Sequence, residues 1–350
     1  MKIALLGVKG EFGQSYGKGV QRYMYEMYMR LRKVPGIEVN KVEYGLLPVA
    51  GVGLSFMFHN VFQDLSGYDI VHNLDIKPFY KLRQTWKTRI TTAHEFRPLI
   101  HPELIVGPRS STKEKLWLRL VTNLAYRSLL KSDYLTANSS QTKGEAISLG
   151  FDKEKIFVVN HGLDEKFTSG ALLEERSAGE NFKVGYIGSL SLGKNISMAV
   201  EAVKKIDDKN LKFEIWGEGP EANRIRSVAS EDKRIRLKGF VPESVIIKTY
   251  DSFDVFVAPS LYEGFGLPIL EAQSRGLPVV IYKKGKIAKE VRRYCFEAKD
   301  TEDMAAIIKG IKDNGFDEKL REKATQYARS FTWENTVKGT AEVYKKVIDT

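Results

Sequence analysis

The segment that most constrains the fold is residues 251–282, which predict a strand, a glycine-rich turn, a short helix and a second strand. Residues 251–258 (DSFDVFVA) have an apolar core and are typical of a buried strand. Pro268 suits the first turn of a helix, where its missing N–H is not needed and its φ is already helical. Gly276 suits the left-handed residue after the helix, and residues 277–282 (LPVVIY) predict the next strand.

The glycine-rich turn in this segment predicts an anion site. The free N–H groups of Gly266 and Leu267, together with the helix dipole, attract negative charge. Gly264 and Gly266 carry no Cβ, so a phosphate can come close to the backbone. Glu263 precedes the turn and Glu271 lies one turn into the helix, where both can accept hydrogen bonds from hydroxyls. Two carboxylates around a cradled phosphate indicate a nucleotide sugar; the alternative of two solvated helix-end charges does not explain the loop.

Length and composition bound the class of protein. A chain of 350 residues is too long for one ordinary core and predicts two domains. The apolar content of 43% and charged content of 28% are those of a soluble globular protein. The most apolar stretch, residues 44–62, is broken by Pro48 and glycines, and it falls short of the roughly 18 to 20 apolar residues of a membrane span.

The N-terminus and the cysteine content predict where the protein works. Residues 1–7 (MKIALLG) run into a glycine-rich loop, which is typical of a first strand and not of a signal peptide. Cys295 is the only cysteine, so no intrachain disulfide and no cysteine zinc cluster can form. A cytoplasmic location is expected, with a peripheral position on the inner face of the membrane if lipid is bound.

The net charge of +11 is concentrated in one part of the chain. Residues 77–131 hold twelve Lys and Arg against three Glu. Within them, residues 113–131 have helical periodicity with a basic polar face and include Trp117. Basic amphipathic helices rest on anionic membrane surfaces, but a core-packing helix with a solvated basic face has the same pattern, and both interpretations stay open. Nucleic acid is not expected as a partner, because no recognition motif accompanies the charge.

Strand and helix signals alternate along the chain. A polar stretch, residues 168–181, predicts a linker between two halves of the chain, each of which has this alternation of strands and helices. The predicted strands are residues 2–7, 39–44, 69–72, 89–93, 134–138, 156–160, 183–188, 213–217 and 235–239, and the predicted helices include residues 20–33 and 197–205. This pattern predicts an α/β fold of two Rossmann-like, doubly wound parallel-sheet domains that face a central cleft. The expected domains are residues 1–165 and 166–330, with a helix in residues 331–350 that packs back on the first.

Several motifs occur in an order that a known family shares. Glu263 and Glu271 match an E-x7-E signature, and residues 184–195 (VGYIGSLSLGKN) resemble a strand and loop that supply basic phosphate ligands. Four shorter segments resemble further motifs of this family: residues 19–23 (GVQRY), 158–164 (VVNHGLD), 215–220 (IWGEGP) and 237–242 (LKGFVP). On these motifs the chain resembles the retaining glycosyltransferases of family 4, which have the GT-B fold.

The resemblance implies roles for particular residues. Glu271 would hold the ribose of the nucleotide, Glu263 would bind hydroxyls of the transferred sugar, and Lys194 would neutralise the departing diphosphate. The remaining donor-binding positions of this domain are Ser189, Gly264, Phe265, Gly266 and Leu267. No cofactor and no metal are expected, since the nucleoside diphosphate sugar is the co-substrate.

One position departs from the family pattern. The family usually pairs the lysine with an arginine, whereas this chain has Ser189 and Gly193 at the two usual places. Half of the usual cationic clamp is therefore missing, or it is supplied from elsewhere, for instance by Lys9 or Lys18.

The first half of the chain holds the remaining candidates. Residues 91–96 (TTAHEF) place His94 at a strand end, where α/β sheets bind ligands, and the resemblance puts this His near the sugar's reacting face. His72 is a rival at another strand end, and His161 is a weaker candidate. In the loop after the first strand, Gly10 and Gly19 are expected to touch the diphosphate of the donor.

The expected function is sugar transfer from a nucleoside diphosphate sugar to a hydroxyl acceptor with retained configuration. The acceptor is a glycan, a lipid-linked glycan or another small molecule, and the first domain is expected to bind it. A nucleotide-sugar epimerase or hydrolase on the same fold is one alternative, and a non-catalytic nucleotide-sugar-binding subunit is another, favoured by the absent arginine. A nicotinamide oxidoreductase is a more distant alternative.

Overall fold

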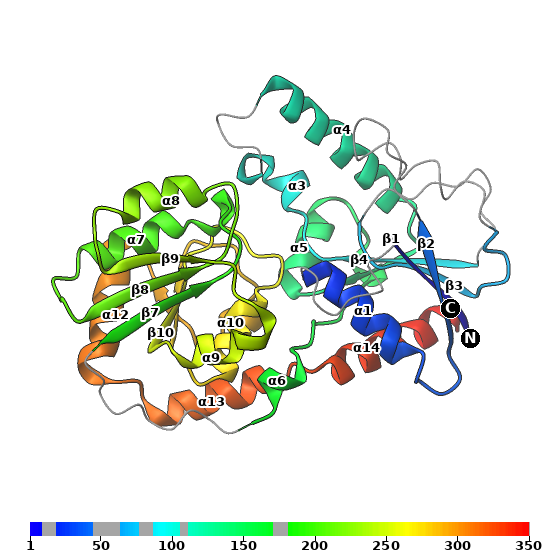
Figure 1. Ribbon diagram of the computed structural model, residues 1–350. Helices are drawn as coiled ribbons and strands as arrows, with labels where there is room; N and C mark the ends of the chain where they lie inside the picture. The colour runs from blue at the N-terminus through cyan, green and yellow to red at the C-terminus, as the bar shows by residue number, and fades with distance from the viewer. Residues whose placement is uncertain (9–18, 45–63, 77–86, 106–110, 171–180, 350) are drawn as a thin grey trace. The chain divides into compact units, whose positions relative to one another are not determined.

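The computed structural model describes residues 1–8, 19–44, 64–76, 87–105, 111–170 and 181–349. The chain divides into two compact units, which are Met1–Gly162 with Trp333–Thr350, and Leu163–Thr332 (Figure 1). The first is called the N-terminal unit and the second the C-terminal unit. The chain passes from one unit to the other after Gly162 and after Thr332, close to the expected boundaries at residues 165 and 330.

The N-terminal unit is built on one parallel sheet. Its strands run in the order β2-β1-β3-β4-β5-β6. They are β1 Lys2–Val8, β2 Glu38–Tyr44, β3 Ile70–Asn73, β4 Thr88–Ala93, β5 Tyr134–Ala137 and β6 Ile156–Val158. Its helices are α1 Gly19–Leu31, α3 Arg97–Ile100, α4 Thr112–Leu129, α5 Ser140–Ser148 and α14 Trp333–Ile348, with short 3₁₀ turns η1 Pro102–Leu104 and η2 Lys153–Lys155.

Both faces of this sheet are buried, which explains the apolar run in the first strand. Ile3 and Leu5 pack into the core formed with α1 and α14, while Ala4 and Leu6 pack with Leu65 on the other face. Successive side chains of a strand point to opposite faces, so a strand covered on both sides is apolar throughout. The C-terminal helix α14 lies beside α1 in this unit (Figure 1).

The C-terminal unit has a second parallel sheet, in the order β12-β11-β10-β7-β8-β9. Its strands are β7 Phe182–Ile187, β8 Leu211–Trp216, β9 Ile235–Gly239, β10 Val255–Ala258, β11 Val279–Tyr282 and β12 Phe296–Ala298. Its helices are α6 Glu165–Thr168, α7 Ile196–Lys204, α8 Ala222–Ala229, α9 Ile246–Asp251, α10 Leu267–Ser274, α11 Lys289–Arg292, α12 Thr301–Asn314 and α13 Glu318–Arg329, with η3 Leu192–Lys194 and η4 Glu243–Val245. The strand order reverses between β7 and β10, and ligands of open α/β sheets bind at such a reversal.

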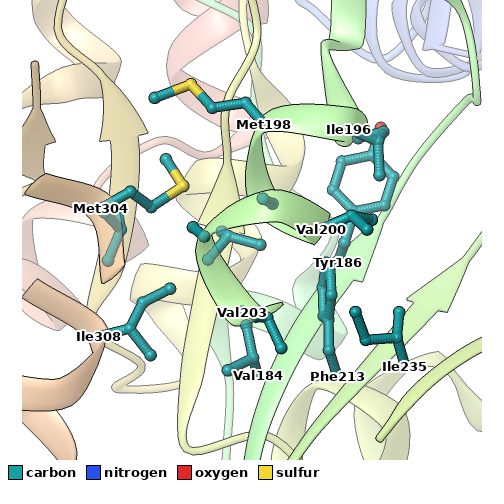
Figure 2. Packing of buried hydrophobic residues seen from close by; sticks show 14 of the residues in the cluster. Val184, Tyr186, Ile196, Met198, Val200, Val203, Phe213, Ile235, Met304 and Ile308 are labelled. Carbon is teal, nitrogen blue, oxygen red and sulfur yellow. The ribbon is translucent and has the colours of Figure 1, made fainter. Parts of the chain in front are cut away.

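The core of this unit fixes the strands on which the site depends. Val184 and Phe213 from neighbouring strands pack against Val203 of α7 and against Met304 and Ile308 of α12 (Figure 2). These side chains are completely buried. Fully buried side chains of this size contribute roughly 1.5 to 3 kcal/mol each, so the strand ends are held rigidly. The prediction of two doubly wound parallel sheets is confirmed.

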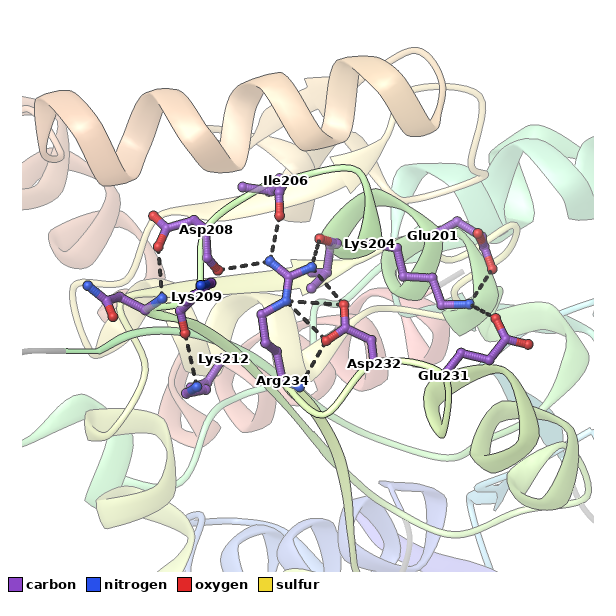
Figure 3. Close-up of polar contacts among 11 residues, drawn as sticks. Glu201, Lys204, Ile206, Asp208, Lys209, Lys212, Glu231, Asp232 and Arg234 are labelled. Carbon is purple, nitrogen blue, oxygen red and sulfur yellow. Dashed lines mark hydrogen bonds and ion pairs between the residues drawn. The ribbon is translucent and has the colours of Figure 1, made fainter.

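A polar clamp closes the end of α7. The guanidinium group of Arg234 donates hydrogen bonds to the backbone carbonyls of Val203, Ile206 and Asp208 and to the carboxylate of Asp232 (Figure 3). Each of these carbonyls also accepts a backbone N–H, so Arg234 adds a second donor to each and ties the loop after α7 to the start of β9. The Asp232 contact, followed by its charge, raises the pKa of Arg234, although burial opposes this rise.

We expect Arg234→Ala to lower the free energy of unfolding by about 2 kcal/mol, because three hydrogen bonds to carbonyls and the ion pair with Asp232 are lost at once. Thermal or urea denaturation of the full chain measures this loss. Arg236→Ala is the matched control, since Arg236 lies two residues further on, in β9, with an exposed side chain. Equal stability of the two variants would contradict the structural role of the clamp.

Candidate functional site

The turn before α10 has the backbone conformation that the sequence predicts. Gly266 is the residue preceding the helix and has φ 100°, which is left-handed and strained for any residue with a side chain. Pro268 follows in the first turn of the helix. The first N–H groups of α10 have no partner within the helix and are directed away from its start. This end of α10 is therefore suited to bind an anion.

A buried ion pair lies next to this helix end. The Lys194 ammonium group donates to Glu263 Oε2 over 2.6 Å, and the Ser260 hydroxyl donates to Glu263 Oε1 over 2.6 Å. Only 8% of the Glu263 surface is exposed. Each carboxylate oxygen therefore has a donor, which is the condition for burying a charged group. Lys194 comes from the loop after β7 and Glu263 from the loop after β10, so the reversal of strand order brings them together.

A cavity of about 130 Å³ opens beside the ion pair. Its lining comes from both strand ends and from the start of α10: Tyr186, Ile187, Gly188, Ser189, Lys194, Phe256, Ala258, Glu263, Pro268 and Ile269. The Tyr186 hydroxyl donates to the carbonyl of Ser189 over 2.9 Å, which fixes the loop that forms one wall. Burial, and after it the Glu263 charge, raises the pKa of Tyr186 well above its ordinary value, so the phenol stays neutral. The cavity thus combines one cation, one anion and neutral walls.

Glu271 lies further along α10 and has a different partner. The hydroxyl of the fully buried Tyr250 donates to Glu271 Oε2 over 2.7 Å. Burial and the Glu271 charge raise the pKa of Tyr250 well above 10, so this donor is permanently protonated. Tyr250 therefore fixes the orientation of the Glu271 carboxylate. Neither Tyr250 nor Ser260 was predicted: Tyr250 meets Glu271 only in the folded chain, whereas Ser260 lies three residues before Glu263 and was a usable local signal.

The other predicted donor-binding residues lie in different places, with Gly264 in the turn before α10 and Leu267 as the first residue of that helix. Ser189 lines the cavity with its residue exposed. Phe265 is buried and its ring packs 6.0 Å from that of Phe331, so only its backbone faces a ligand at the turn. Gly19 is the first residue of α1 in the N-terminal unit, and a Cβ there would meet no atom within 4 Å. Gly10, together with Lys9 and Lys18, lies outside the described residues.

His94 of the N-terminal unit belongs to a buried cluster of rings. Its Nε2 lies 2.7 Å from the carbonyl oxygen of Leu74 and its Nδ1 lies 3.2 Å from Nε2 of His161. A carbonyl only accepts, so Nε2 carries the proton and a neutral His94 accepts from His161 through Nδ1. Tyr23 stacks on His161 and meets His94 edge-on, with ring centroids 4.7 and 4.8 Å away. The two candidate histidines are thus partners, and the adjacent Glu95 pairs with Arg97 over 2.9 Å.

His72, the other predicted candidate, is a fully buried structural residue. Its Nε2 lies 2.8 Å from the hydroxyl of Thr92 and its Nδ1 lies 2.6 Å from that of Tyr344 in α14. Burial, and after it the positive charge of a protonated His94, lowers the pKa of His72 from 6.5 to about 3. Burial also lowers the pKa of His161. These histidines are neutral near neutral pH and join α14 to the sheet.

This environment predicts that the protein loses stability in mild acid. The unfolded chain binds a proton on His72 below pH 6.5, whereas the folded chain does so only near pH 3, so stability falls between these values. At about pH 5 the loss from His72 is about 2 kcal/mol. Denaturation curves near pH 7 and pH 5 measure it. His72→Gln is expected to show a smaller pH dependence than wild type; the same pH dependence in both would contradict the assignment.

Two absences concern the described residues only. Among them, no group of three or more His, Cys, Asp or Glu side chains has a geometry that could hold a metal ion. No helix in the described part of the chain is long and apolar enough to span a membrane.

Two protein-family models match consecutive parts of the chain. The model described as Glycosyltransferase Family 4 matches residues 35–167, and the model described as Glycosyl transferases group 1 matches residues 174–331. The second segment contains Lys194, Glu263 and Glu271, so the cavity lies within the matched region.

Two proteins of similar sequence are glycosyltransferases. The chain is 28% identical over 242 residues to an uncharacterized glycosyltransferase of Methanocaldococcus jannaschii, across 63% of this chain and 62% of that protein. It is 26% identical over 317 residues to the D-inositol 3-phosphate glycosyltransferase of Corynebacterium urealyticum, across 80% of this chain and 72% of that protein. The match to the first relative therefore spans less than two thirds of that protein's length.

Solved structures share the two-unit architecture. The sucrose-phosphate synthase of Thermosynechococcus elongatus has a TM-score of 0.75 at 16% identity, over 99% of both chains. Anabaena HepE, solved in complex with UDP and glucose, has a TM-score of 0.68 at 18% identity, over 99% of this chain and 100% of that one. At such identities the likeness shows the fold, which is the GT-B fold.

The two sheets and the two family models define the class of protein, a GT-B glycosyltransferase. The chain belongs to glycosyltransferase family 4, with a group 1 glycosyltransferase domain as its C-terminal unit.

Proposed function

We propose that this protein transfers a sugar from a nucleoside diphosphate sugar to a hydroxyl acceptor with retention of configuration. The observation that carries the proposal is the Lys194–Glu263 pair beside the start of α10. A cation and the N–H groups of a helix start suit a diphosphate, and a carboxylate suits sugar hydroxyls. Complexes of Anabaena HepE with UDP and with UDP-glucose support a nucleotide sugar as the ligand of this fold.

The ion pair suggests how donor binding proceeds. In the structure the Lys194 ammonium group is held by Glu263. An arriving diphosphate offers Lys194 a more strongly charged partner, and Glu263 Oε2 then becomes available to a sugar hydroxyl. Glu263 Oε1 remains bound to Ser260, so the carboxylate keeps its orientation during the exchange. Sugar recognition is thereby linked to recognition of the diphosphate.

The chemical step follows from the charges at the site. The bond between the anomeric carbon and the diphosphate breaks, and its electron pair leaves with the diphosphate. Lys194 and the start of α10 stabilise this growing charge. The acceptor oxygen bonds to the anomeric carbon on the same face, and its proton passes to the departing phosphate. We assign Glu263 to hydroxyl binding and not to nucleophilic attack, since Ser260 keeps Oε1 and a sugar hydroxyl takes Oε2 once Lys194 has moved to the diphosphate.

The proposal also gives roles to Glu271, to the N-terminal unit and to His94. Glu271, oriented by Tyr250, would accept hydrogen bonds from the ribose hydroxyls. The unit Met1–Gly162 with Trp333–Thr350 would bind the acceptor, and His94 would act there. No metal and no cofactor are assigned a role in the reaction.

We expect Lys194→Ala to lower kcat by at least about 100-fold, the loss typical of removing one group that stabilises developing charge. Glu263→Gln should also lower kcat, because the sugar hydroxyl loses its charged acceptor. Glu263→Gln should retain nucleoside diphosphate binding, whereas Lys194→Ala should weaken it. Nucleotide release from a panel of nucleoside diphosphate sugars, with and without added glycan or lipid-linked acceptors, measures the change in kcat. Calorimetric titration with the nucleoside diphosphate measures the change in binding.

Glu322→Gln is the control for these variants, because Glu322 is exposed on α13. Transfer at the wild-type rate by Glu263→Gln would contradict the assigned site. Nucleotide release that needs no acceptor would favour an epimerase or hydrolase, and tight binding without any turnover would favour a non-catalytic subunit.

The helix α4 favours a membrane-associated acceptor. Ser111 and Glu114 form a capping box at its start. Glu114 is the only acidic residue of the helix, and its carboxylate is hydrogen-bonded in this box. Residues spaced by three and four then form one face, and this stripe contains no acidic residue: Lys113, Leu116, Leu120, Asn123, Arg127 and Leu130. Leu116 and Leu120 are 67% and 46% exposed. Exposed leucines between cations suit an anionic lipid surface, and we propose that this face rests on one.

We expect the protein to float with vesicles that contain anionic lipid and not with purely zwitterionic vesicles. Leu116→Asp with Leu120→Asp should abolish flotation, because it removes apolar contacts and adds repulsive charge. Val245→Asp is the control, since Val245 is a 38% exposed apolar residue of the C-terminal unit. Absence of wild-type flotation would contradict the membrane proposal.

A further inference from the structure

The cavity holds less positive charge than a leaving diphosphate requires. Among the described residues that line it, Lys194 alone is cationic, and the Glu263 carboxylate already balances that charge. The family's usual second cation is absent, because Ser189 and Gly193 stand at its two usual places. A further cation near the start of α10 would complete the charge balance of the proposed reaction.

The loop after β11 is rich in exposed lysines. Residues 283–289 read KKGKIAK, and the four lysines, Lys283, Lys284, Lys286 and Lys289, are all exposed. The strand β11 lies next to β10 and parallel to it. The loop therefore leaves the sheet at the same edge as the loops that carry Lys194 and Glu263.

Backbone hydrogen bonds join this loop to the ion pair. The N–H of Lys286 donates to the Leu261 carbonyl over 2.8 Å, and the N–H of Glu263 donates to the Lys286 carbonyl over 2.9 Å. The N–H of Leu261 in turn donates to the Gly193 carbonyl over 2.8 Å. A continuous hydrogen-bonded row thus runs from the residue before Lys194, through the Glu263 loop, to Lys286.

Gly285 allows this close approach. A Cβ at that position would lie 2.2 Å from the carbonyl oxygen of Ser260, a distance that no side chain tolerates. Ser260 is the residue whose hydroxyl holds Glu263. The two lysines that flank Gly285, Lys284 and Lys286, are therefore held beside the loop that carries the carboxylate, on flexible side chains that can turn toward a bound anion.

We infer that Lys286, supported by Lys284, is the second cation of the diphosphate site and takes the place of the missing arginine. The inference rests on the proposed function, since it concerns the leaving group of that reaction. A solvated lysine patch without a ligand would need neither the backbone row to Glu263 nor the contact at Gly285.

Calorimetric titration with UDP, GDP, UMP and GMP tests this inference. We expect Lys286→Gln to bind the preferred nucleoside diphosphate about tenfold more weakly, the effect of losing one charge-assisted contact, and the monophosphate nearly as well as wild type. The salt dependence of diphosphate binding should also become shallower. Lys286→Arg should restore the affinity.

Lys283→Gln is the matched control, because the N–H of Lys283 donates to the Ala298 carbonyl on the β12 side of the same loop. An unchanged diphosphate affinity in the Lys286→Gln and Lys284→Gln double variant would overturn the inference while leaving the proposed function intact. Binding of neither diphosphate by wild type, with no nucleotide released from any sugar of the donor panel, would overturn the proposed function, and the inference with it. Melting curves verify that the variants are folded.

Discussion

The buried Lys194–Glu263 pair is the interaction on which the rest of the site depends. Removing two charges from water is costly, and an ion pair of this kind adds little net stability compared with apolar residues of similar size. Its retention therefore requires another reason. The Ser260 hydroxyl keeps one carboxylate oxygen occupied whatever happens to the other. The lysine can then leave Glu263 for a phosphate at a smaller cost than if the carboxylate were left with no donor.

The parallel sheet explains how so many short loops serve one pocket. The strands β7, β10 and β11 are neighbours and end at the same edge. Each loop supplies one component: Lys194 after β7, Glu263 after β10 and Lys286 after β11. Backbone hydrogen bonds connect the three loops side by side. The geometry of the site is thus set by the sheet, and side chains can be exchanged between loops without moving the anion. An arginine absent from the loop after β7 can in this way be replaced by a lysine from the loop after β11.

Much of this arrangement could be predicted from the sequence because the signals are local. Glycine and proline positions around residues 259–276 define the turn and the helix start, and apolar runs define the strands. The strand β12 was missed because its three residues carry no periodicity and depend on pairing with β11. No element was assigned to α12 and α13, although Asp300 and Asp317 cap them and were usable signals. Tyr250 and the buried side chain of Phe265 could not be predicted, since their contacts with Glu271 and Phe331 join distant parts of the chain. Ser260 lies three residues before Glu263 and was a usable signal.

The histidines of the N-terminal unit show the limit of reasoning from strand ends. His72, His94 and His161 all follow or end strands, and sequence position alone makes them equivalent candidates. Their hydrogen bonds separate them. His72 is held on both ring nitrogens by hydroxyls, which need no charge and suit a structural role. His94 has one nitrogen committed to a carbonyl and the other to His161. Its bond to His161 is between two ionisable groups, so a proton gained by either ring changes the hydrogen bond that they share.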